Sequence, residues 1–235
     1  MNKCNIYELL QKNPYPGRGI LIGCSEEQSI VMAYFIMGRS ENSRNRIFEK
    51  TEDGIRTKAF EPDKMTDPSL VIYSPVRVFN GLTIVTNGDQ TDTIFEFLKQ
   101  GQDFRNALLS RKFEPDAPNY TPRISGLIKP DGSYALSILK TSNGNPNCCN
   151  RYFYEYSSAM PELGHFISTY QTDGEPLPSF DGEPISVDVT ISGGLERFAY
   201  SMWDALNAEN KVSLYVCNMN AKTGEKQDLI INKNS

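Results

Sequence analysis

The sequence predicts an α+β protein in which antiparallel sheet dominates. Short runs of branched and aromatic residues recur along the chain, and only a few segments have the three- and four-residue apolar spacing of a helix. The chain has 235 residues, of which 39% are hydrophobic, enough to bury the core of one large domain. We therefore expect a single domain over residues 1–235, with a short N-terminal extension at residues 1–14.

The expected strands begin with a hairpin. Residues 19–23 and 29–37 are apolar and rich in branched and aromatic side chains, and the polar segment 25–28 between them is a turn. Further strands are expected at residues 69–73, 76–79, 82–86, 123–128, 133–140, 151–156, 165–170, 185–191, 211–217 and 228–231. Several are separated by turn pairs with hairpin chemistry, namely Asn80-Gly81, Asp131-Gly132 and Asn143-Gly144. Most of the sheet is therefore expected to be antiparallel.

Helices are expected in four places. A short helix covers residues 6–11, and two more cover residues 91–99 and 102–111, separated by Gly101. The last covers residues 195–206, with Ser192 as a candidate cap. Antiparallel sheets with a few amphipathic helices favour a layered α+β domain.

The charge and hydropathy of the chain exclude several classes of function. The formal net charge is -5, whereas general nucleic-acid binding depends on many cationic contacts spread over one face. No apolar run approaches the roughly 18 residues of a membrane span, and the N-terminus lacks the apolar core of a secretory signal. We therefore expect a cytoplasmic protein that binds neither nucleic acid nor a membrane.

The cysteines and the histidine do not indicate a metal centre. The five cysteines are odd in number and show no C-x-x-C spacing, so we expect reduced thiols. His165, the one histidine, lies in an expected strand, where a structural role is the more common one. A role as general base stays open, and no metal is expected.

The densest polar motif is the segment 38–46, directly behind an apolar strand. Arg39, Arg44 and Arg46 lie within it, interleaved with Ser and Asn side chains. Because the guanidinium fork matches phosphate oxygens, this pattern predicts a seat for a small anion. The alternative is a solvated charged loop.

Two other polar segments lie at expected strand ends. Gly17 and Arg18 open the first strand, where glycine either lets a ligand approach the backbone or simply forms a turn. Residues 87–92 lie between a strand and a helix, where free backbone amides can bind an anion. Alternatively, Asp89 or Thr91 caps that helix.

The loop 114–123 contains three prolines together with carboxylate, amide, phenol and guanidinium groups. Proline stiffens a loop, and a stiff loop can hold such groups ready for a ligand. A purely structural loop is the alternative.

In their order along the chain, these motifs resemble those of the archaeal-type IMP cyclohydrolases and their bacterial relatives. The resemblance covers roughly residues 15–190. It rests on Gly17-Arg18, Arg39-Ser40, Asn45-Arg46, Tyr73 with Arg77, Asn87-Gly88, Thr91-Asp92 and Thr121-Pro122-Arg123-Ile124. Each motif is short, and their co-occurrence in one order makes the match specific. The chain differs from the shorter archaeal pattern in the segment before Tyr15 and in its C-terminal length.

The resemblance implies a four-layer αββα sandwich, similar to the N-terminal nucleophile hydrolases but without a processed nucleophile. It also implies the last step of purine synthesis, in which formamidoimidazole carboxamide ribonucleotide closes to inosine monophosphate (IMP) and loses water. In this family an arginine, a tyrosine and a carboxylate line the reacting centre. By motif position these are Arg39, Tyr73 and Glu114, with Asp116 as a competing carboxylate. The reaction has no redox or metal step, so no cofactor is expected.

Other polar residues of the motifs are expected to bind the nucleotide. They are Arg18, Ser40, Asn42, Arg44, Asn45, Arg46, Asn87, Gly88, Asp89, Asn119, Tyr120 and Arg123. The expected partner is a small purine nucleotide, and a homo-oligomer is compatible with the sequence. Two alternatives stay open. One is an N-terminal nucleophile type amidohydrolase, for which Cys4 is the nearest nucleophile, and the other is a noncatalytic purine nucleotide-binding module.

Overall fold

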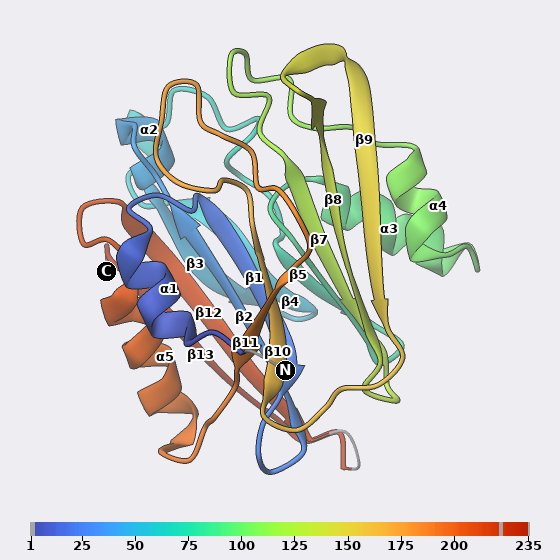
Figure 1. Cartoon of the computed structure of the whole chain (residues 1–235). Coiled ribbons are helices and arrows are strands. Elements are labelled where there is room, and N and C mark those ends of the chain that lie inside the picture. Colours follow the sequence, from blue (N-terminus) through green and yellow to red (C-terminus); the bar gives the residue numbers. More distant parts are fainter. Residues whose placement is uncertain (1–2, 221–222, 235) are drawn as a thin grey trace.

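The computed structural model describes residues 3–220 and 223–234 and contains two large antiparallel sheets (Figure 1). One sheet consists of β1 (Arg18–Cys24), β2 (Ser29–Met37), β10 (Leu163–Ser168), β11 (Ile185–Asp188), β12 (Lys211–Asn220) and β13 (Lys226–Asn232). Its strands lie in the order β11-β10-β1-β2-β12-β13. The other consists of β3 (Arg46–Thr51), β4 (Gly54–Ala59), β5 (Val76–Phe79), β6 (Leu82–Thr86), β7 (Arg123–Ile128), β8 (Tyr134–Ser142) and β9 (Asn145–Tyr156), in sequential order.

The helices are short and few. They are α1 (Ile6–Lys12), α2 (Glu41–Arg44), α3 (Gln90–Lys99), α4 (Phe104–Leu109) and α5 (Gly194–Ala205), with a 3₁₀ turn at Pro62–Lys64. In the described ranges, no helix has the length and apolar character needed to cross a membrane. The chain is therefore an α+β protein with two antiparallel sheets, as predicted.

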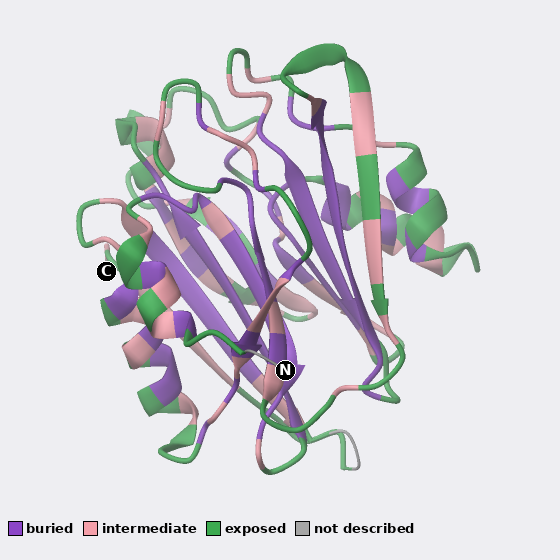
Figure 2. Cartoon of the chain, in the orientation of Figure 1, coloured by how far each residue is buried: buried purple, intermediate pink, exposed green. Residues whose placement is uncertain are grey.

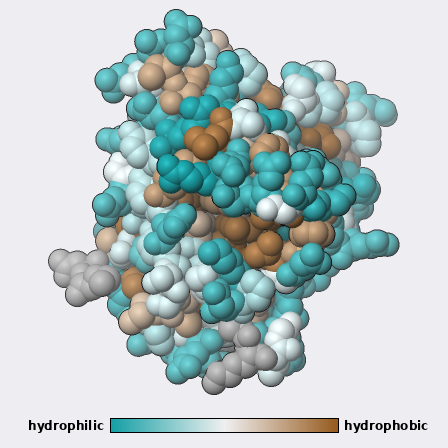
Figure 3. All heavy atoms as spheres, turned by 90° about the vertical axis from the view of Figure 1, so that its right-hand side faces the viewer, coloured by the Kyte–Doolittle hydropathy of each residue, from teal (hydrophilic) through white to brown (hydrophobic). Residues whose placement is uncertain are grey.

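Helices cover the outer face of each sheet. Ile6 of α1 and Phe198 of α5 belong to one apolar cluster with Leu21 and Phe35 of the six-stranded sheet. On the other side of the molecule, α3 and α4 pack on the seven-stranded sheet through a second cluster. The face of the molecule on that side is mostly hydrophilic around a hollow where apolar side chains show (Figure 3). The layers follow one another as helices, sheet, sheet and helices.

The main core lies between the two sheets. Ile20 and Tyr34 of the six-stranded sheet pack there with Ile55, Val85 and Ile138 of the other. All nine residues of β2 are buried, because one face meets this core and the other meets α1 and α5 (Figure 2). Such double burial explains why β2 reads as an uninterrupted apolar run.

Most predicted elements are present, with three corrections. Residues 69–73 do not form a strand, because the amides of Val71 and Ile72 donate to the Pro68 carbonyl in a turn. β3 and β4 were not predicted, since each contains charged residues and neither forms an apolar run. The cap of α5 is Gly193 and not Ser192.

The polar motifs meet at one end of the sandwich, uppermost in Figure 1. β1 and β3 begin there with Arg18 and Arg46, β6 ends there just before Asn87, and the loop 114–122 leads there into β7. The antiparallel topology thus brings together segments that are far apart in the sequence.

Candidate active site

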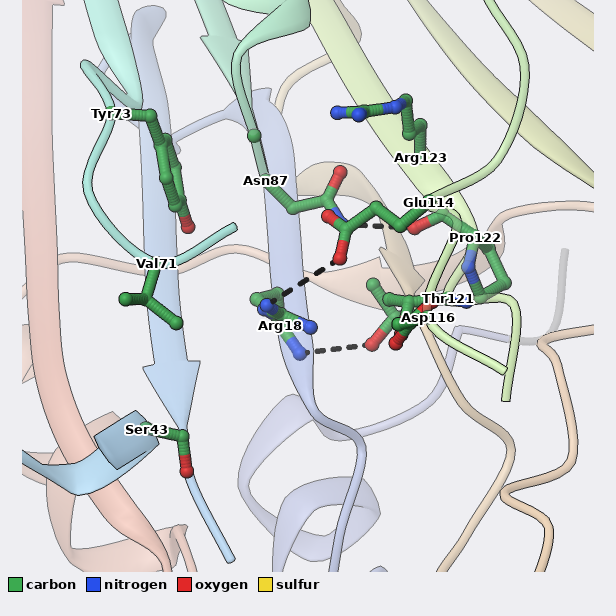
Figure 4. A network of polar contacts seen from close by, with 12 residues as sticks. Arg18, Ser43, Val71, Tyr73, Asn87, Glu114, Asp116, Thr121, Pro122 and Arg123 are labelled. Carbon is green, nitrogen blue, oxygen red and sulfur yellow. Dashed lines mark hydrogen bonds and ion pairs between the residues drawn. The ribbon is translucent and has the colours of Figure 1, made fainter. Parts of the chain in front are cut away.

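Arg18 and Glu114 form the centre of this polar end (Figure 4). Arg18 Nη2 lies 3.9 Å from Glu114 Oε2, and the two side chains are only 11% and 2% exposed. The Glu114 backbone amide donates to the Thr121 carbonyl at 2.9 Å, which closes the proline-containing loop and fixes the position of the carboxylate. A charged pair is therefore held where water has little access.

Burial raises the pKa of Glu114 to about 7, although the nearby guanidiniums of Arg18 and Arg123 act in the opposite direction. At Arg18 the neighbouring groups outweigh burial. Burial alone lowers the pKa of Arg18, but the charge of Glu114 and the neighbouring tyrosines raise it by more, so this guanidinium stays charged. A carboxyl group with a pKa near neutrality can both accept and release a proton, which is the requirement for general acid–base catalysis.

Arg46 and Tyr73 lie in the same cluster. Arg46 is fully buried, and its Nε donates to the Ser43 carbonyl at 2.7 Å. Burial lowers its pKa, the nearby Tyr73 opposes that shift, and the charge of Arg18 adds to it. Tyr73 precedes β5, and its amide donates to Thr57 Oγ1 at 2.8 Å. The site therefore contains two buried cations and a phenol around one carboxyl group.

Several atoms of this cluster have no hydrogen-bond partner. Across the described residues, eight buried side-chain nitrogen and oxygen atoms lack one, and three of them are Arg18 Nε, Arg46 Nη1 and Glu114 Oε1. Leaving a buried charged group unpaired is costly, and such groups are retained where a ligand completes them. Two N–H donors and one carboxylate acceptor fit a polar, anionic ligand.

A second group of predicted residues builds the wall behind Glu114. Arg123 Nη1 lies 2.6 Å from Gln90 Oε1 and 2.7 Å from Asp89 Oδ1, and Arg123 Nε donates to the Lys112 carbonyl at 3.0 Å. Gly88 lies against this wall: a Cβ atom there would come within 2.6 Å of Arg123 Nη1 and 3.3 Å of Glu114 Oε1. These polar groups therefore already have partners within the protein.

Asn87 belongs to the same wall. Its Nδ2 donates to the Pro122 carbonyl at 2.9 Å, and its Oδ1 accepts from the Ile124 amide at 2.8 Å. Asn87 thus ties the end of β6 to the start of β7, and Asp89 stands at the N-cap of α3 without a side-chain cap bond.

The loop next to Glu114 is stabilised by its own polar groups. Asp116 accepts from the Thr121 amide at 2.6 Å and also from the Thr121 hydroxyl. Asn119 Oδ1 accepts from the Leu177 amide at 3.0 Å, and the Tyr120 ring packs edge-on against Phe113. Of the two predicted carboxylates, Glu114 is the one with an oxygen that has no hydrogen-bond partner.

A cavity of about 490 Å³ adjoins this loop, lined by Pro118 and Asn119 together with Lys140, Tyr152 and Asp181. Arg18, Tyr73 and Glu114 do not line it. Its charged residues neutralise each other, because Lys140 Nζ donates to Asp181 Oδ1 at 2.7 Å. We place the candidate site at the Glu114 cluster, where buried ionisable groups remain unpaired.

The predicted seat of three guanidiniums is not formed. Arg39 is partly exposed, pairs with Asp173 at 2.8 Å and lies over the Tyr15 ring. Arg44 donates to the Gly38 carbonyl and to Asn210 Oδ1, both at 2.9 Å. Only Arg46 turns into the cluster, so Arg46 and not Arg39 is the arginine beside Tyr73 and Glu114.

The reason is a helical turn that the sequence reading missed. Ser40 and Ser43 form a reciprocal capping box at the start of α2, which directs the side chains before and after it in different directions. Asn42 and Asn45 bind the loop that follows β4, through Thr66 and Glu61 respectively. Ser40, Asn42 and Asn45, which were all predicted to bind the ligand, therefore support the local backbone.

The remaining sequence expectations concern thiols, the histidine and metal ligands. All five cysteines are free, as predicted. His165 Nδ1 lies 2.6 Å from the Tyr134 hydroxyl, its ring stacks on Tyr156, and burial lowers its pKa to about 4. Within the part of the chain that the structure describes, no group of three or more His, Cys, Asp or Glu side chains is arranged to hold a metal ion.

A known protein family matches the part of the chain that contains this whole cluster. The sequence model of the IMP cyclohydrolase-like proteins matches residues 15–224, a range that contains Arg18, Arg46, Tyr73 and Glu114. The chain belongs to this family. The resemblance seen in the short sequence motifs is thereby confirmed.

Individual IMP cyclohydrolases are similar over most of their length. The chain is 27% identical over 194 residues to the IMP cyclohydrolase of Methanopyrus kandleri, which covers 77% of the chain and 96% of that relative. It is 32% identical over 191 residues to that of Halobacterium salinarum, covering 80% and 84% respectively. It is 28% identical over 162 residues to that of Methanosphaera stadtmanae, covering 67% and 74%.

Sequence reasoning missed two polar residues that contact the predicted ones. Gln90 bridges Arg123 and Asn87, and Tyr34 bonds the Tyr73 hydroxyl. The sequence contains one sign that Tyr34 has a polar contact: besides Ser29, it is the only residue of the apolar run 29–37 that carries a hydroxyl. Both stand directly behind residues with a predicted role.

Proposed function

We propose that the protein is an IMP cyclohydrolase, which closes 5-formamidoimidazole-4-carboxamide ribonucleotide to IMP with loss of water in purine biosynthesis. The observation that carries this proposal is the buried cluster of Arg18, Arg46, Tyr73 and Glu114, with its unpaired Nε, Nη1 and Oε1 atoms. The family membership and the relatives named IMP cyclohydrolase support the same reaction.

In this proposal Glu114 is the proton carrier. The attacking atom is a carboxamide nitrogen, whose lone pair is delocalised, so bond formation needs a base positioned beside it. With a pKa of about 7, Glu114 is partly ionised at neutral pH and can take the proton as the nitrogen bonds to the formyl carbon. It can return that proton when the carbinolamine loses its hydroxyl group.

Tyr73 and the two buried arginines stabilise the developing oxyanion. As the carbon–nitrogen bond forms, negative charge collects on the formyl oxygen, and preorganised donors at low dielectric stabilise it. Tyr73 is assigned the hydrogen bond to this oxygen, and the unpaired N–H groups of Arg18 and Arg46 supply the positive field. Over the whole reaction the formyl oxygen leaves as water, with one hydrogen from the carboxamide nitrogen and one from the formamide nitrogen.

The phosphate and the ribose of the nucleotide are assigned to residues around the cluster. Arg39 is exposed and lies over the Tyr15 ring, which stacks on Tyr170, and we assign Arg39 to the 5′-phosphate. Asn119 and Tyr120 are assigned to the ribose side. Arg44, Asn45 and Asn42 act indirectly, by holding the segment that carries Arg39 and Arg46.

The fold proposal is the single domain expected from the sequence, with a layer arrangement akin to that of the N-terminal nucleophile hydrolases. The shared core between the two sheets supports the single domain. An amidohydrolase of that kind would require a nucleophile at the start of the first strand, where this protein has Arg18. Cys4 is exposed and bridges to Val187 ahead of α1, so the cyclohydrolase is favoured.

The direct test is incubation of the purified protein with the formamido ribonucleotide, following IMP by its absorbance. We expect IMP formation both with EDTA and with added magnesium. Calorimetry with IMP, run beside this assay, distinguishes the enzyme from the noncatalytic alternative, because a binding module would bind the nucleotide and form no product.

A further inference from the structure

Tyr34 lies behind Tyr73, on the side facing the core between the sheets. It belongs to β2, the hairpin partner of β1, is fully buried, and its hydroxyl lies 2.7 Å from the Tyr73 hydroxyl. The ring stacks on Phe48 with centroids 5.8 Å apart, and the backbone pairs with Ile20 on one side and Tyr215 on the other. Its hydroxyl group is therefore held in a fixed place.

The burial of the two tyrosines favours one direction for this hydrogen bond, in which either oxygen could be the donor. Each of the two hydroxyls carries one hydrogen, but only one hydrogen can lie between the two oxygens. Neither hydroxyl makes another hydrogen bond within the described chain, but Tyr34 is 0% exposed, whereas Tyr73 is 8% exposed and lies near Arg18 and Arg46 in the site. A ligand in the site can therefore accept from Tyr73 but not from Tyr34, and because an unsatisfied buried donor is costly, we assign the donor role to Tyr34 and the acceptor role to Tyr73.

The Tyr73 hydrogen is then available to a different acceptor. In Figure 4, Tyr73 lies on the opposite side of Arg18 from Glu114, with its hydroxyl end toward Val71. A hydroxyl that accepts one hydrogen bond becomes a stronger donor of another, since the two bonds polarise each other.

We infer that Tyr34 is a positioning residue of the active site, which donates to the Tyr73 oxygen and so aims the Tyr73 hydrogen at the formyl oxygen of the substrate. The inference rests on the proposed cyclohydrolase function. Tyr34 does not touch the substrate, and its whole effect on the reaction passes through Tyr73.

The test is a double-mutant cycle of Tyr34→Phe and Tyr73→Phe in the IMP-forming assay. Removal of the Tyr34 hydroxyl is expected to lower kcat by about tenfold and to change KM by less than about twofold, because the lost interaction matters in the transition state. In the Tyr73→Phe background the same change is expected to have no further effect on kcat, since the group through which it acts is already gone.

Tyr215→Phe is the matched control. Tyr215 is the cross-strand neighbour of Tyr34 and is also fully buried, but its hydroxyl bonds Asp228 Oδ2 at 3.1 Å instead of Tyr73. We expect unchanged kcat for this variant. Thermal melts of all variants check that the core stays folded.

Two results would overturn the inference while leaving the cyclohydrolase in place. One is a Tyr34→Phe enzyme as fast as the wild type. The other is an equal fall in kcat with and without the Tyr73 hydroxyl, which would show a structural effect. A wild-type protein that forms no IMP would instead reject the proposed function, and the inference with it.

Discussion

Arg18 Nη2 and Glu114 Oε2 lie 3.9 Å apart in a buried site, a separation too long for a tight ion pair. The carboxyl group is therefore only partly stabilised by its partner, and burial raises its pKa to about 7. A closer, bidentate pair would keep Glu114 ionised at all working pH values. The loose pairing leaves it able to exchange a proton near neutrality.

The first prediction concerns stability and pH. The pKa of Glu114 is raised from 4.5 to about 7 on folding, so the folded state holds this proton more tightly than the unfolded state. Its contribution to stability is complete below pH 4.5 and is lost as the pH rises through 7. We expect the wild type to lose roughly 3 kcal/mol of unfolding free energy over this range relative to Glu114→Gln, from the shift of about 2.5 pKa units. Urea denaturation of both proteins across the range measures it, and parallel curves would contradict it.

The second prediction concerns Arg18. Its positive charge lowers the pKa of Glu114, so Arg18→Met should raise that pKa further. The midpoint of the pH dependence of kcat/KM, which rises as Glu114 loses its proton, is expected to move to higher pH. Arg18→Lys retains the charge and should move it much less. A midpoint that stays in place in Arg18→Met would show that another group controls the profile.

The third prediction separates the three arginines of the segment 38–46. Arg46→Lys is expected to lower kcat by tenfold or more, at about 1.4 kcal/mol per tenfold step, because lysine cannot replace the buried fork. Arg39→Ala should mainly raise KM, since Arg39 is assigned to the remote phosphate. Arg44→Ala is expected to change kcat and KM less than either, because Arg44 acts only by holding the segment through Gly38 and Asn210. Equal effects of all three changes on KM would contradict this separation and support a common anion-binding site formed by the three arginines.

The fourth prediction concerns Tyr73. Tyr73→Phe removes the proposed oxyanion donor and should lower kcat by roughly a hundredfold with little change in KM. Tyr215→Phe is a suitable control, since the Tyr215 hydroxyl bonds Asp228 and not a residue of the site. A Tyr73→Phe enzyme with normal turnover would remove Tyr73 from the mechanism.

The local parts of the fold were predictable from the sequence. β1 and β2 are apolar on both faces and joined by a short turn, and β5 and β6 are joined by Asn80-Gly81, so each hairpin is specified by neighbouring residues. β3 and β4 were missed because both are short and rich in charged residues, and their strand structure depends on pairing within the sheet.

The candidate site was predictable in its composition and not in its arrangement. Glu114 and Tyr73 were singled out from sequence, and both lie in the cluster. The direction of each guanidinium in the segment 38–46 depends on the capping of α2 and on partners far along the chain, such as Asp173 for Arg39 and Asn210 for Arg44. Tyr34 was missed because a tyrosine in a buried strand looks like a core residue until its hydroxyl partner is known.

The most direct measurement is the rate of IMP formation from the formamido ribonucleotide by the wild type and by Glu114→Gln, side by side near neutral pH. Glutamine keeps the shape of the side chain and removes its ability to carry a proton. We expect the wild type to form IMP and the variant to be slower by about a hundredfold or more, with KM little changed. Equal rates, or no IMP from the wild type with EDTA or with magnesium, would contradict the assignment of this buried carboxyl group.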